Sequence, residues 1–180
     1  IRNNAALLAY QVIDQPGPEL FDKWRTLTRV MSAIDSNHPG FSALSSEAAV
    51  KASKQLGSQM VVFDRYPLTT QTQPGQYNFQ EYIQALEMVK TETSGLPYWS
   101  VLQAFSSPAG ARYPTAAELR LMTYLSLAHN AKGIFYFLYN SHTQQDRREG
   151  IVDTNLAPGP LYGEISKLAT EVKRLSDVML

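Results

Sequence analysis

The sequence predicts an α/β fold in which parallel strands alternate with helices. Short apolar runs of β-forming residues end in polar or turn-forming residues, and between these runs apolar side chains recur at three- and four-residue steps. The main strand runs are apolar on both faces, which is typical of a parallel sheet covered by helices. The chain has 180 residues, 44% of them hydrophobic, and no linker pattern. It is therefore expected to form a single domain over residues 1–180.

Strands are expected where apolar runs stop abruptly at polar residues. The first begins near Leu7 and stops at Asp14, just before Gln15-Pro16-Gly17, and a weaker strand spans residues 40–44. Three clear runs follow: QMVVFDRYPL at 59–68, LPYWSVLQAF at 96–105 and IFYFLY at 134–139. Because ligands bind at the carboxyl ends of parallel strands, the polar residues at these ends are the first candidates for a site.

Helices are expected in the intervals between these strands. Each interval carries an apolar stripe on one helical face, and a Thr115/Glu118 capping box opens the fourth. The expected helices cover residues 19–35, 46–56, 78–93, 115–130 and 161–175. The chain thus contains about five strand–helix units.

The composition argues against several classes of partner and cofactor. The 16 basic and 16 acidic residues balance, and no Lys/Arg stripe is present, so no nucleic acid partner is expected. Without cysteine there are no thiolate metal sites, and His38, His129 and His142 lack metal-ligand spacing. No nucleotide or phosphate motif occurs, so neither a metal nor a cofactor is expected. The apolar runs are too short to span a bilayer.

The N-terminal residues are expected to continue a longer protein sequence. Residues 1–4, IRNN, show neither an initiator Met nor a signal-peptide pattern. Any targeting segment is expected upstream, and the expected location is extracellular or periplasmic.

Several motifs together resemble a known enzyme group. They are NNAALLAYQVIDQPG, VVFDRYPL, PYWSVLQAF, RYPTAAELRLMTYLSLAHNAKGIFYFLY and GIVDTNLAPGPLYGEISKLATEV. In these motifs the chain resembles the C-terminal part of a clan A glycoside hydrolase (β/α)8 barrel, in the neighbourhood of the β-galactosidase-like and cellulase-like families. The resemblance implies a β-linked oligo- or polysaccharide as the partner.

This resemblance implies about strands four to eight of a TIM barrel. Five such units alone would leave open strand edges and a half-covered interior. The missing strands are therefore expected from residues outside this chain or from a partner chain.

The resemblance also assigns chemistry to two strand ends. In such barrels the fourth strand ends in an acid/base Glu, usually just before Pro, and the seventh ends in a nucleophile Glu. The matching positions here are Gln15 and Gln103. An amide can neither protonate a leaving oxygen nor act as a carboxylate nucleophile, so the sequence departs from the pattern where catalysis depends on it.

Three interpretations remain open. Gln15 replaces a parental Glu, by evolution or by a deliberate inactivating change. Alternatively, Asp14 serves as the acid and Asp64 as the base, with Tyr66 positioning them. In the third, the barrel binds carbohydrate or serves assembly without catalysis, so whether this chain is an active enzyme is left open.

Further side chains are candidates for contacts with sugar rings. Tyr66, Tyr136 and Tyr139 offer aromatic faces, and Tyr66 and Tyr139 lie near strand ends. Arg112 follows the third clear strand in a loop on the side of the site. Gln103 is a candidate for the same role. Trp99 lies early in its strand and is expected to pack inside the protein.

Overall fold

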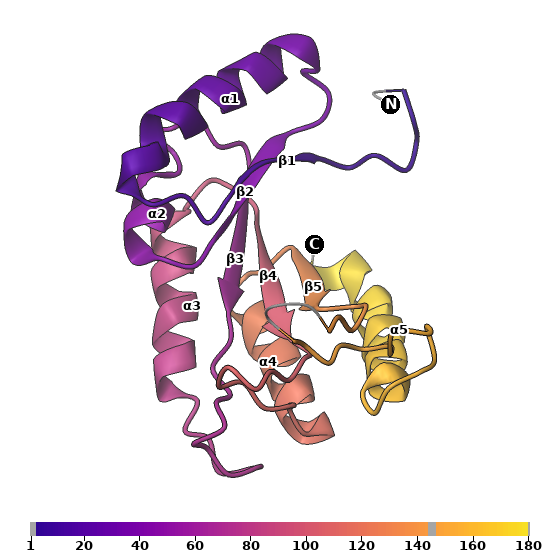
Figure 1. The fold of residues 1–180 in the computed structure, drawn as a ribbon. Coiled ribbons are helices and arrows are strands. Elements are labelled where there is room, and N and C mark those ends of the chain that lie inside the picture. Colours follow the sequence, from indigo (N-terminus) through magenta and orange to yellow (C-terminus); the bar gives the residue numbers. More distant parts are fainter. Residues whose placement is uncertain (1–2, 144–146, 180) are drawn as a thin grey trace.

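Five parallel strands form one open sheet in the computed structural model, which describes residues 3–143 and 147–179. The strand order follows the chain order, β1-β2-β3-β4-β5. The strands are β1 (Tyr10–Asp14), β2 (Gly40–Leu44), β3 (Val61–Arg65), β4 (Tyr98–Gln103) and β5 (Gly133–Phe137). A helix follows each strand, so the predicted α/β alternation is confirmed (Figure 1).

The helices match the predicted intervals with shifted ends. They are α1 (Phe21–Ile34), α2 (Glu47–Ala52), α3 (Gln80–Glu92), α4 (Ala116–Ala128) and α5 (Tyr162–Met179), with a short 3-10 turn over Pro18–Leu20. The capping box at Thr115 and Glu118 is present at the start of α4. Helix α2 ends before residue 56, where the Ser53 hydroxyl donates to the Val50 carbonyl and the chain turns.

Strand β1 begins at Tyr10 rather than near Leu7. Pairing with β2 starts only there, with Tyr10 opposite Gly40, and the residues before it run away from the sheet (Figure 1). The register of the β1–β2 pairing shifts between Gln11 and Ile13, and this irregularity changes the direction in which the side chains of the last β1 residues point.

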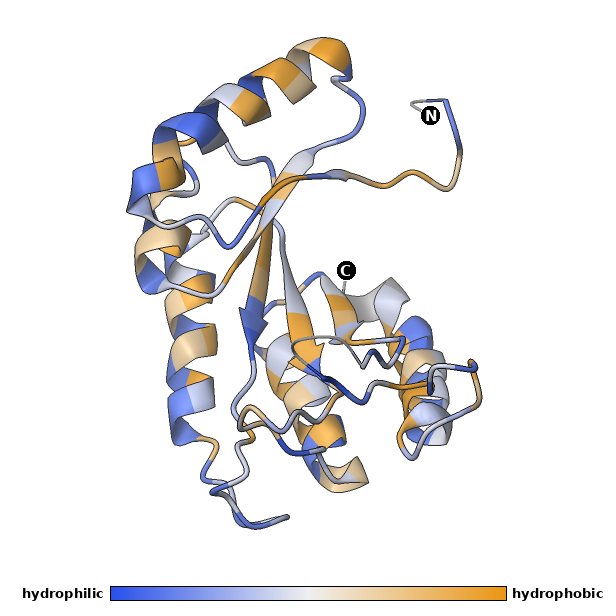
Figure 2. Ribbon diagram, viewed as in Figure 1, coloured by the Kyte–Doolittle hydropathy of each residue, from blue (hydrophilic) through white to orange (hydrophobic). Residues whose placement is uncertain are grey.

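One face of the sheet is covered by the helices. Alternate strand residues such as Leu44, Phe63 and Leu102 are buried there against helix residues such as Trp24 and Leu119. The helices in Figure 2 accordingly mix hydrophobic and hydrophilic positions, and β3 and β4 each contain a hydrophobic stretch. Because side chains alternate along a strand, this packing places the remaining strand residues on the opposite face of the sheet.

The opposite face carries a smaller apolar cluster built from strand and loop residues. Met60, Val62 and Val101 are buried in it, and Trp99 and Phe137 pack against them. Phe135 on β5 remains 41% exposed. A sheet of this kind is half covered, as the sequence predicted for an incomplete barrel.

No helix in residues 3–143 or 147–179 is long and apolar enough to cross a membrane.

Candidate functional site

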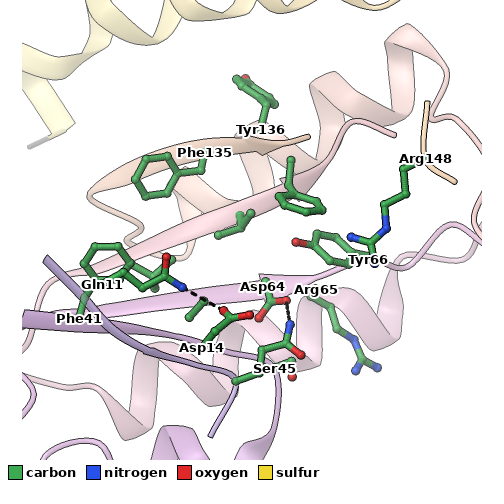
Figure 3. A pocket seen from close by; sticks show the side chains of 15 residues that line it. Gln11, Asp14, Phe41, Ser45, Asp64, Arg65, Tyr66, Phe135, Tyr136 and Arg148 are labelled. Atoms are coloured by element: carbon green, nitrogen blue, oxygen red, sulfur yellow. Dashed lines mark hydrogen bonds between the residues drawn. The ribbon is translucent and has the colours of Figure 1, made fainter. Parts of the chain in front are cut away.

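The carboxyl ends of β1 and β3 bring three predicted residues together. Asp14 ends β1, Gln15 follows it, and Asp64 lies near the end of β3. The Gln15 Nε2 atom donates to Asp64 Oδ2 at 2.7 Å, and this bond joins β1 and β3 across the intervening strand β2. Figure 3 shows Asp64 with a dashed line that marks a hydrogen bond. This contact links two residues 49 positions apart in the chain.

Gln15 is held in an unusual backbone conformation. Its φ angle is +41°, in the left-handed region that side chains other than glycine rarely adopt. Its backbone N–H donates to the Ala43 carbonyl at 2.9 Å, which anchors the turn to β2. Strained backbone of this kind often occurs at binding and catalytic sites.

Asp14 and Asp64 line the same cavity, of about 820 Å³, at this edge of the sheet (Figure 3). The cavity is lined by residues of all five strands and by Arg148, which follows β5. Its lining is Gln11, Asp14, Gln15, Phe41, Ala43, Ser45, Val62, Asp64, Arg65, Tyr66, Val101, Phe135, Tyr136, Phe137 and Arg148. A cleft with both apolar walls and a few convergent polar groups suits a small ligand or a sugar ring.

The two carboxyl groups have different surroundings. Asp14 is exposed, and its Oδ1 accepts from Gln11 Nε2 at 3.0 Å. Asp64 is only 4% exposed, and its Oδ1 has no hydrogen-bond partner among the described residues. Burial raises the pKa of Asp64 above its usual range, and the negative charge of Asp14 adds to the effect.

Tyr66, Phe105 and Phe137 form an aromatic cluster, and Tyr66 and Phe137 line the cavity. The Tyr66 and Phe137 rings stack with centroids 5.7 Å apart, and both lie edge-on to Phe105. The Arg148 guanidinium lies 5.3 Å and 5.4 Å from the centroids of Phe105 and Phe137. Burial raises the pKa of Tyr66, so its hydroxyl stays protonated at neutral pH.

Gln103 lies at the carboxyl end of β4 but makes structural contacts. It is fully buried, and its Oε1 accepts from the Leu68 N–H at 2.9 Å. Its Nε2 donates to the carbonyls of Leu68 and Arg112, both at 2.9 Å. The side chain thus ties together the loops that follow β3 and β4.

The Arg112 side chain also serves those loops. Its guanidinium forms a two-pronged ion pair with Glu118, at 2.7 and 2.8 Å, and its Nε donates to the Thr72 carbonyl. Burial alone would raise the pKa of Glu118, but hydrogen bonds from Arg112, Thr115 and Gly75 outweigh it and lower the pKa to about 2. Arg112 therefore lies outside the cavity, in a loop-fixing network.

The remaining predicted aromatic residues are placed differently from one another. Tyr136 borders the cavity, but its hydroxyl shares a hydrogen bond with Thr123 of α4 at 3.1 Å. Tyr139 is 55% exposed and lies outside the cavity. Trp99 packs against Phe135, as its early position in the strand indicated.

Several lining residues were not singled out from the sequence. Phe135 and Phe137 are two positions apart on β5, so strand periodicity could have placed both on the inner face. Gln11 could have been found in the same way on β1. Arg148 lies in a charged run that reads as solvated surface, and no local signal indicates that its side chain reaches the aromatic cluster.

Within the described part of the chain, no group of three or more His, Cys, Asp or Glu side chains could hold a metal ion.

The chain resembles several solved structures, including the following two. A beta-galactosidase from the psychrophilic Marinomonas ef1 matches with a TM-score of 0.71 and 16% identity, over 88% of this chain. A GH2 beta-galacturonidase from Eisenbergiella tayi, bound to galacturonate, matches with a TM-score of 0.59 and 14% identity, over 86% of this chain. This chain spans 27% and 31% of those two chains, so its open sheet corresponds to part of a TIM barrel.

Sequence comparison gives the family. No curated protein matches the chain. The model of glycoside hydrolase family 42, described as beta-galactosidase, matches residues 32–175, which include β2 to β5 and most of α5. The match covers well over half of the chain, and the resemblance noted in its motifs points the same way. The chain belongs to the glycoside hydrolase family 42 beta-galactosidase family.

Proposed function

We propose that the cavity at the carboxyl ends of the strands binds a β-linked oligo- or polysaccharide. The observation that carries this proposal is the convergence of Asp14, Gln15, Asp64 and Tyr66 on one cavity that also has aromatic walls. Carboxylates and amides pair with sugar hydroxyls, while the apolar face of a pyranose ring packs on aromatic side chains. Membership of a glycosidase family supports a saccharide over other polar ligands.

The proposal includes the missing part of the barrel. Phe135 is 41% exposed on the inner face, and the sheet ends at β1 and β5 with open edges. Strands from residues outside this chain, or from a partner chain, would cover that face and close the cavity. The activity of the site is therefore to be tested on the complete protein.

Binding without hydrolysis is the outcome that the geometry favours. Gln15 stands at the position where the resemblance places the acid/base Glu, and its amide is bonded to Asp64. Gln103 stands near the expected nucleophile position, and all its polar atoms bond to loop backbone. Neither amide can supply the proton or the nucleophile that glycoside hydrolysis needs.

Hydrolysis by Asp14 and Asp64 is the second candidate. Both carboxyl groups line one cavity, which a catalytic pair requires, and an inverting pair works with its groups about 6.5–9.5 Å apart. The sequence suggested Asp14 as the acid and Asp64 as the base. The raised pKa of the buried Asp64 suits the general acid instead and leaves the exposed Asp14 as the base, with the Tyr66 hydroxyl beside them.

The test measures binding and reducing-sugar release on one polysaccharide panel, with the complete protein and its Gln15→Glu variant. Binding without release in both forms supports the binding function. Release by the Gln15→Glu variant alone assigns the acid/base role to position 15. Release by the unaltered protein that Asp64→Asn abolishes supports the second candidate, and failure to bind any saccharide refutes the proposal. Gln76→Glu, on an exposed loop residue, controls for the added charge.

A further inference from the structure

The hydrogen bond between Gln15 and Asp64 decides which end of the Gln15 amide faces a ligand. The oxygen and nitrogen of an amide have nearly the same shape, so their placement follows from the neighbouring groups. Asp64 Oδ2 lies 2.7 Å from one of the two atoms, and an ionised carboxylate can only accept a hydrogen bond. At a pH above the raised pKa of Asp64, where this carboxyl group is ionised, the nitrogen therefore faces Asp64. Oε1 is then left without a described partner in an exposed residue that lines the cavity.

We propose that Asp64 is a positioning residue that holds the Gln15 amide with its carbonyl oxygen facing the cavity. Position 15 then accepts a hydrogen bond from a saccharide hydroxyl, where a catalytic acid would donate to a glycosidic oxygen. The inference rests on the proposed saccharide binding, and it narrows the ligand to one with a free hydroxyl at this point.

The surroundings of both residues suit this role. Asp64 is 4% exposed and sits in β3, the central strand of the sheet, so its carboxyl group has little freedom to move. Gln15 is fixed at its other end by the bond from its backbone N–H to the Ala43 carbonyl. An acceptor that is already oriented before the ligand arrives loses less conformational entropy on binding.

The orientation can be measured without a ligand. In the complete protein labelled with 15N-glutamine, the Gln15 side-chain amide is identified by its loss in Gln15→Leu. One of its two amide protons is expected to resonate downfield and to shift as Asp64 titrates, and Asp64→Leu should remove both effects. Asp22→Asn is the matched control, because Asp22 lies on α1 outside the cavity and is bonded to Arg25, and its variant should leave the shift in place. Amide protons at ordinary positions, unchanged in Asp64→Leu, would overturn the proposal.

The consequence for the ligand is tested with methyl β-D-galactopyranoside and its monodeoxy analogues. One analogue should bind the unaltered protein about tenfold more weakly than the parent glycoside, which corresponds to one lost hydrogen bond. The same analogue should lose no further affinity in Gln15→Leu, where the acceptor is already gone. Asp64→Leu should weaken binding of the parent glycoside and remove the difference in affinity between the parent and that analogue.

The two proposals fail in different ways. If the parent glycoside and the polysaccharide panel do not bind at all, the proposed function fails, and the amide resonances still decide whether Asp64 orients Gln15. If the parent binds and the analogues rank identically in the unaltered protein and in Gln15→Leu, the acceptor role of Gln15 is wrong while saccharide binding stands.

Discussion

Replacing Gln103 by Glu should destabilise the protein strongly and in a pH-dependent way. The side chain is fully buried and faces one N–H, of Leu68, and two carbonyl oxygens, of Leu68 and Arg112. A carboxylate could still accept from the N–H, but its second oxygen would face the two carbonyls without a proton between them. A buried carboxyl group in such surroundings has its pKa raised, by up to about 3–5 units when fully buried.

The magnitude follows from that shift. With a pKa raised by about 3 units, the ionised form costs about 4 kcal/mol, at 1.36 kcal/mol per unit. The protonated form can donate to one carbonyl and leaves the other unpaired, which costs about 1–2 kcal/mol. The pKa of the introduced carboxyl group is higher in the folded state than in the unfolded state. The free-energy cost of ionising it in the folded protein is therefore small below about pH 4.3 and grows as the pH rises through the folded pKa.

Denaturant unfolding of the complete protein at pH 4 and pH 7 measures both contributions. The difference in unfolding free energy between Gln103→Glu and the unaltered protein should be about 3–4 kcal/mol larger at pH 7 than at pH 4. Gln76→Glu, on an exposed loop residue, should change stability by less than about 0.5 kcal/mol at either pH. If Gln103→Glu matched this control at pH 7, the structural role assigned to Gln103 would be wrong.

Three further predictions concern the loops and the cavity wall. The Glu118 pKa is lowered to about 2, so the ion pair with Arg112 contributes stability above about pH 4.5, and this stability is lost as the pH falls toward 2. Arg112→Met should lower the unfolding free energy by about 3 kcal/mol at pH 7 in denaturant unfolding. The variant's unfolding free energy should also change less between about pH 4.5 and pH 2 than that of the unaltered protein. Thr115→Ala should cost about 1 kcal/mol by losing the helix cap, whereas Thr115→Ser, which keeps the hydroxyl, should cost much less in the same assay. Tyr66→Ala should weaken saccharide binding about tenfold in calorimetry by removing the ring stacked on Phe137, and Tyr66→Phe should keep most of the affinity; equal losses in the two variants would assign the contribution to the hydroxyl instead of the ring.

The elements of the fold could be predicted because their signals are local. Even the weak run at 40–44 forms the strand β2, and every predicted helix exists with an end shifted by a few residues. The strand-end residues Asp14, Gln15 and Asp64 could be placed together for a related reason. Parallel strands in one sheet bring their carboxyl ends to the same edge, so a polar residue at each end predicts a shared site.

The partners within the site could not be predicted, because they depend on contacts between distant segments. The Gln15 bond to Asp64 passes over β2, and it needs the left-handed backbone at Gln15 that nothing in its neighbouring residues specifies. Arg148 reaches the cavity from a loop after β5, and its sequence neighbours are charged and solvated. Chain topology decides these pairings, and sequence periodicity carries no information on it.

The two glutamines show what the structure adds to a family resemblance. Both stand at or near positions where the resemblance expects a catalytic Glu, and the sequence offers no reason to treat them differently. Gln15 is exposed in the cavity, and within the described part of the chain its side chain has one hydrogen bond, to a carboxylate. A Glu at position 15 could therefore be accommodated with a proton shared with Asp64. Gln103 is buried, and its amide oxygen and nitrogen are hydrogen-bonded to backbone groups of two loops. A Glu at position 103 would therefore destabilise the folded protein. One substitution at position 15 can therefore introduce a carboxyl acid, whereas a nucleophile at position 103 would first require the loops after β3 and β4 to be rebuilt.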